Sequence, residues 1–336
     1  DRYAAIMQGF FHQDENAQDL PACLRRVRQR EMLRIAWRDL LGIADVEQTC
    51  MDLSLLAEAL LQFALEQLEE ELCAELGTPR NKQGLSQHLI VLGMGKLGAY
   101  ELNFSSDIDL IFTYAEDGQT DVNGLSNQEF FLRLGQRLIS CIQLPTAQGF
   151  VFRVDMRLRP HGDAGPLVMS FAAMEDYYQI HGRDWERYAF IKARPVAGDV
   201  AQGKILLKRL GAFVFRRYLD FAAIQSLREM KQMIAAQVRR KGMHNNIKLG
   251  AGGIREVEFI GQIFQLIRAG RQPRLQQAGI LPVLKALASL NYLPEYVVKQ
   301  LRSAYLFLRK LEHVLQEYAD QQTHEIPEDE AGRLRV

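Results

Sequence analysis

Apolar residues recur every three or four positions through the first quarter of the chain, which predicts amphipathic helices. Leu61, Leu65, Leu68 and Leu72 show this spacing, and glutamates occupy several positions between them, as on the solvent-facing side of a helix. The segment GTPRNKQG at residues 77–84 is rich in turn formers and ends the pattern. We therefore expect a region of N-terminal helices over residues 1–76.

After this loop the pattern changes to short apolar runs, which predict β-strands. The runs cover residues 88–93, 107–114, 151–160 and 167–170, and a helical stretch over 127–142 separates the second from the third. Strands and a helix over such a short length indicate a small α+β domain. We place this domain at residues 77–200.

Helical patterning returns at residue 170, through the segments AAMEDYYQIH and GRDWERYAFIKARP. Further helices are expected at 221–241, 254–269, 281–290 and 294–318, with short breaks marked by glycine or proline. Short connections between helices favour antiparallel neighbours. Residues 201–336 are therefore predicted to form a C-terminal helical bundle.

The composition of the 336 residues is that of a globular protein, with 48% hydrophobic and 24% charged residues. Lys and Arg (41) balance Asp and Glu (41), so no overall field attracts nucleic acid or an anionic membrane, and we expect neither as a partner. The four scattered cysteines include no CxxC pair, which fits reduced thiols, and no apolar stretch approaches the ~20 residues of a membrane span. We expect a cytoplasmic location. Because the sequence begins at Asp1 within a helical pattern, we expect it to be part of a longer protein.

Residues 88–112, HLIVLGMGKLGAYELNFSSDIDLIF, allow two interpretations. The GMGKLG segment after an apolar run is similar to a dinucleotide-binding fingerprint, which needs a crossover helix within a unit of about 30 residues. Here eight residues separate Gly98 from Asp107, so the second strand begins too soon for a full crossover. A glycine-rich turn can also expose backbone N–H groups to a phosphate without that topology. We favour this second interpretation and keep the dinucleotide site as the alternative.

Two aspartates, Asp107 and Asp109, lie on the same face of the strand predicted over 107–114. Two carboxylates in an apolar strand repel each other and cost several kcal/mol to desolvate unless a positive charge neutralises them. A divalent cation with oxygen ligands is the natural partner, and Mg²⁺ commonly uses one or two carboxylates together with substrate phosphates. The alternative is a strand end with two solvated aspartates.

The strand predicted over 151–160 adds a third carboxylate. Its alternation places Asp155 on one face together with Arg153, Arg157 and Arg159. Three carboxylates can hold two Mg²⁺ ions about 3.5–4 Å apart, and such a pair can clamp the attacking and leaving oxygens of an in-line displacement at phosphorus. Guanidinium groups bind phosphate oxygens in a bidentate manner, although a surface ladder of ion pairs is the alternative for the arginines. A glycine turn, an Asp-x-Asp strand and a later aspartate together indicate a nucleotidyltransferase of the DNA polymerase β type.

Four blocks in order give a resemblance to a known family. They are GMGKLGAYELNFSSDIDLIF, FRVDMRLRP, WERYAFIKARPVAGD and IKLGAGGIREVEF, and LRSAYLFLRKLEH extends the match. From about residue 89 to 265 the chain resembles the glutamine synthetase adenylyltransferase/adenylyl-removing enzymes. That family carries two nucleotidyltransferase halves, an N-terminal half that removes AMP from a tyrosine of glutamine synthetase and a C-terminal half that adds it. ELNFSSDID resembles the removing half, because Ser105 stands where the adding half has glycine.

The resemblance implies a polymerase β-like nucleotidyltransferase domain with flanking helices and a C-terminal helix bundle. Asp107, Asp109 and Asp155 would be the catalytic metal ligands. The reaction implied is phosphorolysis, in which inorganic phosphate attacks the adenylyl-tyrosine and releases ADP. The residues that would bind the nucleotide and phosphate are Gly95, Lys96, Gly98, Ser106, Arg153, Arg157, Arg159, Lys192 and Arg194.

The resemblance also implies partners, namely adenylylated glutamine synthetase and the PII signal protein in its uridylylated form. Two alternatives remain, the adenylyltransferase half that uses ATP and a non-catalytic module that senses PII. In the GGIREVE segment, Glu256 and Glu258 are expected on different faces of a helix. That helix start could bind an anion or could simply pack against the sheet. Lys192 and Arg194 could likewise belong to a solvated helix end.

Overall fold

The computed structural model describes residues 19–217 apart from 148, residues 245–317 and 322–330, and scattered positions within 3–9, 225–240 and at 333. The helix predicted over 221–241 lies largely outside the described residues. No helix among the described residues is long and apolar enough to cross a membrane.

Two long helices, α2 (Leu20–Leu40) and α3 (Val46–Leu76), form the N-terminal region, as predicted. The carboxylate of Asp45 caps α3 by accepting a hydrogen bond from the backbone N–H of Gln48 at 2.8 Å, and the Gln48 side chain accepts from the N–H of Asp45. The leucines that predicted this helix are buried. Their burial confirms the amphipathic pattern.

The central sheet is mixed, with strand order β5-β3-β2-β7 and with β6 also beside β3. Antiparallel pairs join β2 to β3 and to β7, whereas β5 and β6 run parallel to β3. The strands are β2 (Ile90–Gly93), β3 (Ile108–Tyr114), β5 (Val154–Asp155), β6 (Val168–Ser170) and β7 (Arg194–Gly198). A separate antiparallel pair joins β1 (Pro79–Asn81) to β4 (Gly118–Thr120).

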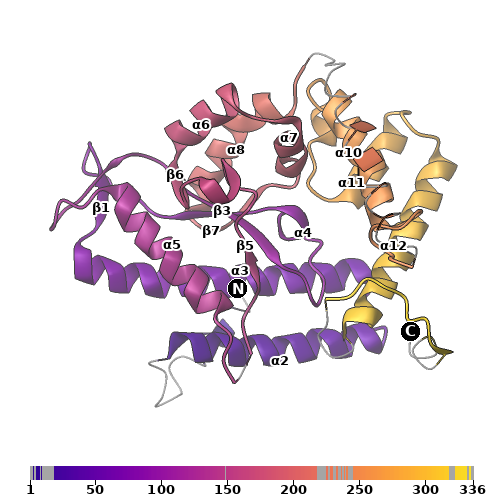
Figure 1. The fold of residues 1–336 in the computed structure, drawn as a ribbon, viewed down its shortest axis with the longest axis horizontal. Helices are drawn as coiled ribbons and strands as arrows, with labels where there is room; N and C mark the ends of the chain where they lie inside the picture. Colours follow the sequence, from indigo (N-terminus) through magenta and orange to yellow (C-terminus); the bar gives the residue numbers. More distant parts are fainter. Residues whose placement is uncertain are drawn as a thin grey trace.

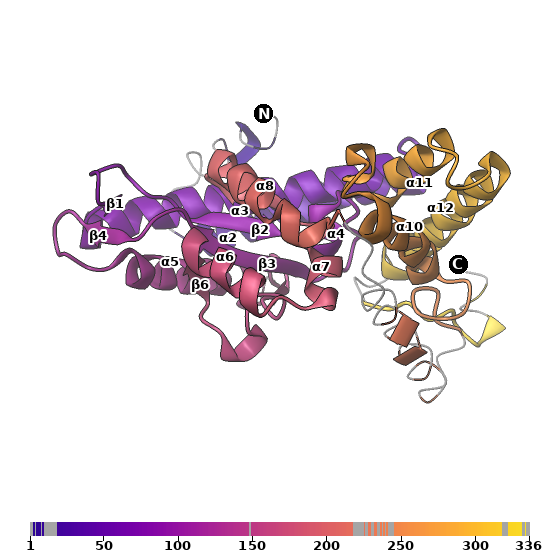
Figure 2. The same cartoon turned by 90° about the horizontal axis from the view of Figure 1, so that it is seen from above.

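Helices cover both faces of the sheet (Figures 1 and 2). On one face, α2, α3 and α5 (Asn127–Gln143) share a core with Ile108, Leu110, Phe112 and Tyr114 of β3. This confirms the predicted apolar face of that strand. The opposite face packs on α6 (Phe171–Ile180), α7 (Asp184–Phe190) and α8 (Val200–Val214). The predicted α+β arrangement is therefore confirmed, while the division at residues 76 and 200 stays a prediction.

Three further helices form a unit beside the end of the sheet that carries the short helix α4 (Gly95–Gly98) (Figure 1). They are α10 (Ile254–Arg268), α11 (Ile280–Ser289) and α12 (Glu295–Glu317), and we call them the helical unit. Val283, Leu284 and Leu287 of α11 are buried in its core. The helices predicted over 254–269, 281–290 and 294–318 are thus confirmed to within one residue at each end.

One alternative is excluded and two sequence-based expectations were wrong. The dinucleotide alternative fails because β2 and β3 are antiparallel and α4 has four residues, so no crossover unit exists here. The strand expected over 151–160 contains two residues, and the chain turns from Arg157 onward. The segment containing Arg194, expected as helix, is β7, paired with β2. Pro195 disfavours a strand assignment, and the register of this pairing shifts between Val91 and Leu92, as is typical where a strand accommodates proline.

The packing of α8 gives a matched pair of predictions. A Cβ on Gly203 would lie 2.6 Å from the Cβ of Pro195, whereas a Cβ on Gly211 of the same helix would meet nothing within 4 Å. We expect Gly203→Ala to destabilise the fold by about 1–3 kcal/mol. Gly211→Ala should be neutral or stabilising by up to about 1 kcal/mol. Denaturant unfolding of both variants measures this, and equal effects would contradict the close α8–β7 packing.

Candidate functional site

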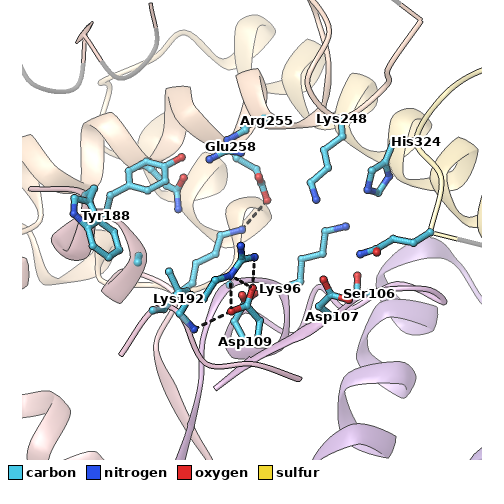
Figure 3. A pocket seen from close by; sticks show the side chains of 18 residues that line it. Lys96, Ser106, Asp107, Asp109, Tyr188, Lys192, Lys248, Arg255, Glu258 and His324 are labelled. Atoms are coloured by element: carbon cyan, nitrogen blue, oxygen red, sulfur yellow. Dashed lines mark hydrogen bonds and ion pairs between the residues drawn. The ribbon is translucent and has the colours of Figure 1, made fainter. Parts of the chain in front are cut away.

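Three carboxylates meet at one end of the sheet. The parallel register of β3 and β5 places Asp109 directly beside Asp155, and Asp107 immediately precedes β3. All three line a pocket of about 650 Å³ between the sheet and the helical unit (Figure 3). Asp155 and Arg157 thus line the same pocket as the two earlier aspartates, as predicted, whereas Arg153 and Arg159, predicted on the same strand face, do not line it.

Asp109 is the most strongly perturbed of the three. Burial, with the nearby charges of Asp155 and Asp107, raises its pKa from 3.8 to about 6. The glycine turn lies against it, since a Cβ on Gly95 would approach its Oδ2 atom to 2.9 Å, and Gly95 has a φ of +54°. A larger residue at this position would displace the carboxylate. Gly95 therefore shapes the carboxylate site directly.

The other two carboxylates are held by arginines. Arg153 donates from Nε to Oδ1 of Asp107 at 2.7 Å and from Nη2 to the hydroxyl of Ser105 at 3.0 Å. Arg157 donates from Nε to Oδ2 of Asp155 at 2.9 Å, and this hydrogen bond lowers the pKa of Asp155. In the part of the chain that the structure describes, no group of three or more His, Cys, Asp or Glu side chains is arranged to hold a metal ion. The arginines thus supply the positive charge at two of the three carboxylates.

Three of the predicted phosphate-binding arginines do not line the pocket, namely Arg153, Arg159 and Arg194. The guanidinium of Arg159 donates to backbone carbonyls of its own loop, at 2.8 Å to Met156. Arg194 donates to the carbonyls of Leu97 and Gly98 at 3.1 Å each, pairs with Glu58, and lies over the ring of Tyr100. It therefore satisfies carbonyl groups at the end of α4, which have no partner within that short helix. Arg194 positions the glycine turn.

Gly98 also has a packing role, because a Cβ there would lie 1.8 Å from the carbonyl oxygen of Lys192. Lys192 lines the pocket, but its Nζ is bound by Glu101 at 2.6 Å and Glu258 at 2.7 Å. Burial alone would lower the pKa of Lys192, yet these two carboxylates raise it. Glu101 also accepts the backbone N–H of Ile280 at the start of α11. This cluster connects the sheet to α10 and α11. The two carboxylates neutralise the positive charge of Lys192.

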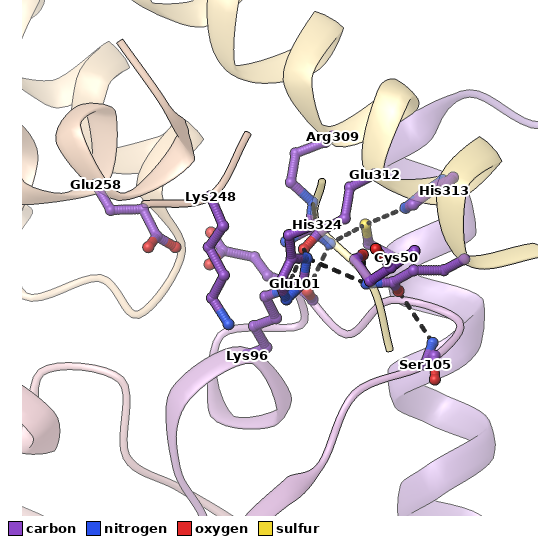
Figure 4. Close-up of polar contacts among 12 residues, drawn as sticks. Cys50, Lys96, Glu101, Ser105, Lys248, Glu258, Arg309, Glu312, His313 and His324 are labelled. Carbon is purple, nitrogen blue, oxygen red and sulfur yellow. Dashed lines mark hydrogen bonds and ion pairs between the residues drawn. The ribbon is translucent and has the colours of Figure 1, made fainter. Parts of the chain in front are cut away.

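Lys96 and Ser106 line the pocket as predicted, and Lys96 connects the glycine turn to α12. Its Nζ lies 2.8 Å from Oε1 of Glu312, whose side chain is fully buried (Figure 4). Arg309 and His324 also approach this carboxylate, at 3.3 and 3.2 Å. Burial alone would raise the pKa of Glu312, but Lys96 and Arg309 lower it well below its usual range. Three cationic or titratable groups thus stabilise one buried carboxylate.

Two more hydrogen bonds fix α12 against the loop that leads to β3. Arg309 donates to the carbonyl of Glu101 at 2.7 Å, and the backbone N–H of Ser105 donates to Oε1 of Gln316 at 3.0 Å. All four residues are buried. The segment that carries the first two aspartates is therefore held by the C-terminal helix.

Apart from the alternative that the helix start of the GGIREVE segment binds an anion, the sequence did not point to the wall of the pocket opposite the carboxylates. The side chains that the prediction missed there are Trp185, Tyr188, Lys248, Arg255, Gln262, Gln322 and His324. The motif IKLGAGGIRE carries two of them, Lys248 and Arg255, and its glycines were the available signal. Glu258 faces the pocket while Glu256 accepts the N–H of Gly252 at 3.0 Å, so the prediction of different helix faces is confirmed.

The comparison with protein families identifies the relationship. Residues 1–209 match the family model described as glutamate-ammonia ligase adenylyltransferase. The chain belongs to this family. Residues 228–336 also match a model described as GlnD PII-uridylyltransferase. The family resemblance found in the sequence is therefore confirmed.

Curated members of the family support the same assignment. The chain is 57% identical over all of its 336 residues to a bifunctional glutamine synthetase adenylyltransferase/adenylyl-removing enzyme from Thioalkalivibrio sulfidiphilus, of which it covers 34%. It is 58% identical over 93% of its length to the enzyme of the same name from Pseudomonas aeruginosa, covering 32% of that protein. The chain spans about a third of the length of the curated relatives it matches.

Asp109→Asn should stabilise the protein in the absence of divalent ions. An ionised Asp109 destabilises the fold because its pKa is higher in the folded than in the unfolded state. The substitution should raise the free energy of unfolding by up to about 3 kcal/mol above pH 6, and this increase should disappear as the pH falls towards 3.8. Thermal unfolding in EDTA at several pH values measures it. Asp163→Asn, at a side chain that is 77% exposed, is the control. A pH-independent effect of Asp109→Asn would contradict the assigned electrostatics.

Glu312→Gln should destabilise the protein by about 3–5 kcal/mol, because it leaves the buried ammonium of Lys96 and guanidinium of Arg309 without their carboxylate. The matched control on the same helix is Glu295→Gln, which removes an exposed pair with Lys299. We expect that control to change stability by less than about 0.5 kcal/mol. Chemical denaturation compares the two, and a loss as small as that of the control would argue against the buried cluster.

Proposed function

We propose that this chain removes the adenylyl group from a tyrosine of glutamine synthetase by phosphorolysis and releases ADP. The observation that carries the proposal is the group of three carboxylates, two of them on adjacent strands, at one wall of the pocket. Family membership supplies the substrate class, since its curated relatives are named adenylyltransferase/adenylyl-removing enzymes of glutamine synthetase. The sequence around Ser105 favours the removing reaction over the adding one.

The carboxylates fit a magnesium site by their chemistry. Asp109 lies beside two other carboxylates and forms no ion pair with any residue that the structure describes, and its burial, together with those two carboxylates, raises its pKa although Lys248 and Arg157 lower it in part. Asp107, Asp109 and Asp155 would hold Mg²⁺, because carboxylate oxygens are the ligands that this ion prefers. When bound, Mg²⁺ stabilises the negative charge on the phosphoryl oxygens. Binding would replace the charges that Arg153 and Arg157 now provide to Asp107 and Asp155.

The reaction itself exchanges one phosphorus–oxygen bond for another. An oxygen of inorganic phosphate forms a bond to the phosphorus of the adenylyl group, and the bond from that phosphorus to the tyrosyl oxygen breaks. The bonding electron pair stays on the tyrosyl oxygen, which takes the proton of hydrogen phosphate, so the products are ADP and tyrosine. The protein's part is to align the two oxygens and to balance charge. Arg153 and Arg157, released from their carboxylates, can donate to phosphoryl oxygens.

A second candidate is the transfer of AMP from ATP to the same tyrosine. The description of the matching family model as an adenylyltransferase favours it. The same carboxylates would serve that reaction, because the phosphorus of the adenylyl group is the atom attacked in both reactions. A non-catalytic module that senses PII is less favoured because Asp107, Asp109 and Asp155 are all present and line one pocket. The match of residues 228–336 to a PII-uridylyltransferase model supports a regulatory response to uridylylated PII.

The direction of the reaction can be measured with glutamine synthetase labelled on its adenylyl group. Incubation of the protein with this substrate, Mg²⁺ and phosphate should release labelled ADP, with no release when phosphate is omitted. Asp109→Asn should abolish the release, and Asp163→Asn should retain it. Labelled AMP formed without phosphate would indicate hydrolysis. Labelling of glutamine synthetase from ATP by this chain alone would show that the second candidate is correct.

A further inference from the structure

The cations that line the pocket differ in whether a carboxylate already binds them. Lys96, Arg157 and Lys192 each form an ion pair. The side chains of Lys248 and Arg255 form no hydrogen bond or ion pair with any residue that the structure describes, although both line the pocket. The two lie on the helical unit side, opposite the carboxylates of the sheet (Figure 3). They are therefore the pocket cations available to an anion from solution.

The position of Lys248 strengthens this assignment. It points into the pocket from one wall while Lys96 points in from the other, with His324 beside them (Figures 3 and 4). Lys248 is half-buried, and its charge contributes to lowering the pKa values of both Lys96 and His324, after the larger effect of burial. Like charges gathered in a partly dehydrated space repel one another. An anion bound between them would relieve that repulsion.

Lys248 lines the same pocket as the three carboxylates of the sheet. Lys248 is close enough to Asp109 to lower its pKa, although burial and the other aspartates raise it overall. A phosphate held by Lys248 would thus lie next to the place where the carboxylates act on the adenylyl phosphorus. Arg255, on the first turn of α10, adds a second, bidentate donor group. Arg153 and Arg157, which the sequence predicted for this role, are paired with Asp107 and Asp155 in the structure.

We infer that Lys248 and Arg255 bind the phosphate group that carries no adenosine, which is the attacking inorganic phosphate and, after the reaction, the β-phosphate of ADP. This inference rests on the proposed function. In this arrangement the sheet provides the carboxylates and the helical unit provides the phosphate site. The active site is therefore complete only when the sheet and the helical unit are held together.

The test uses ADP with Mg²⁺ as the binding probe and inorganic phosphate as the substrate. Lys248→Met and Arg255→Met should each weaken ADP binding in calorimetry and raise the KM for phosphate by about tenfold or more, with a smaller change in kcat. Lys248→Arg should recover much of the binding. Lys285→Met, at an exposed lysine of α11, is the matched control and should behave as the unsubstituted protein. Unfolding curves confirm that each variant is folded.

The outcomes separate this inference from the proposed direction of the reaction. If the unsubstituted protein transfers AMP from ATP and shows no phosphorolysis, the proposed function is wrong. Weaker ADP binding by Lys248→Met and Arg255→Met would then still support the phosphate site. Equal ADP affinity in the two variants and the unsubstituted protein overturns the inference in either case, as does a failure of the unsubstituted protein to bind ADP with Mg²⁺.

Discussion

The buried ion pair between Lys96 and Glu312 joins the two walls of the pocket. Lys96 belongs to the glycine turn that leads towards the carboxylates, and Glu312 belongs to α12 of the helical unit. A buried charge left without its partner is strongly destabilising, so neither residue can leave the other without cost. Lys192, with Glu101 and Glu258, makes a second such connection to α10. These contacts fix the carboxylates of the sheet opposite Lys248 and Arg255.

Charge compensation explains most of the polar contacts around the pocket. Three carboxylates converge at the end of β3 and β5, and Arg153 and Arg157 neutralise two of them. Asp109 stays under-compensated, which is the electrostatic state expected of a site that binds a cation. On the opposite wall, Lys248 and Arg255 are the cations without a carboxylate among the described residues. A metal ion on one wall would neutralise the negative charge of the carboxylates, and a phosphate on the other wall would neutralise the positive charges of Lys248 and Arg255.

Much of the site followed from the sequence because alternation along a strand is local. The period of two placed Asp107 and Asp109 on one face and the apolar residues of β3 on the other, as observed. Arg159 and Arg194 were misassigned because their environments depend on tertiary structure. The first follows a turn that ends β5 early, and the second lies in a strand that contains Pro195. No local pattern could show that Glu312, more than 200 residues from Lys96, would be its partner. The wall formed by Lys248 and Arg255 was missed for the same reason.

A crystal structure of the protein with ADP and Mn²⁺, measured at the manganese absorption edge, tests the account most directly. Mn²⁺ replaces Mg²⁺ at oxygen sites and gives an anomalous signal that identifies it. The account predicts anomalous peaks beside Asp109, with Asp107 and Asp155 turned away from Arg153 and Arg157, and the β-phosphate of ADP in contact with Lys248 and Arg255. Carboxylates that keep their arginine partners, with no manganese peak and with ADP bound elsewhere, would contradict it.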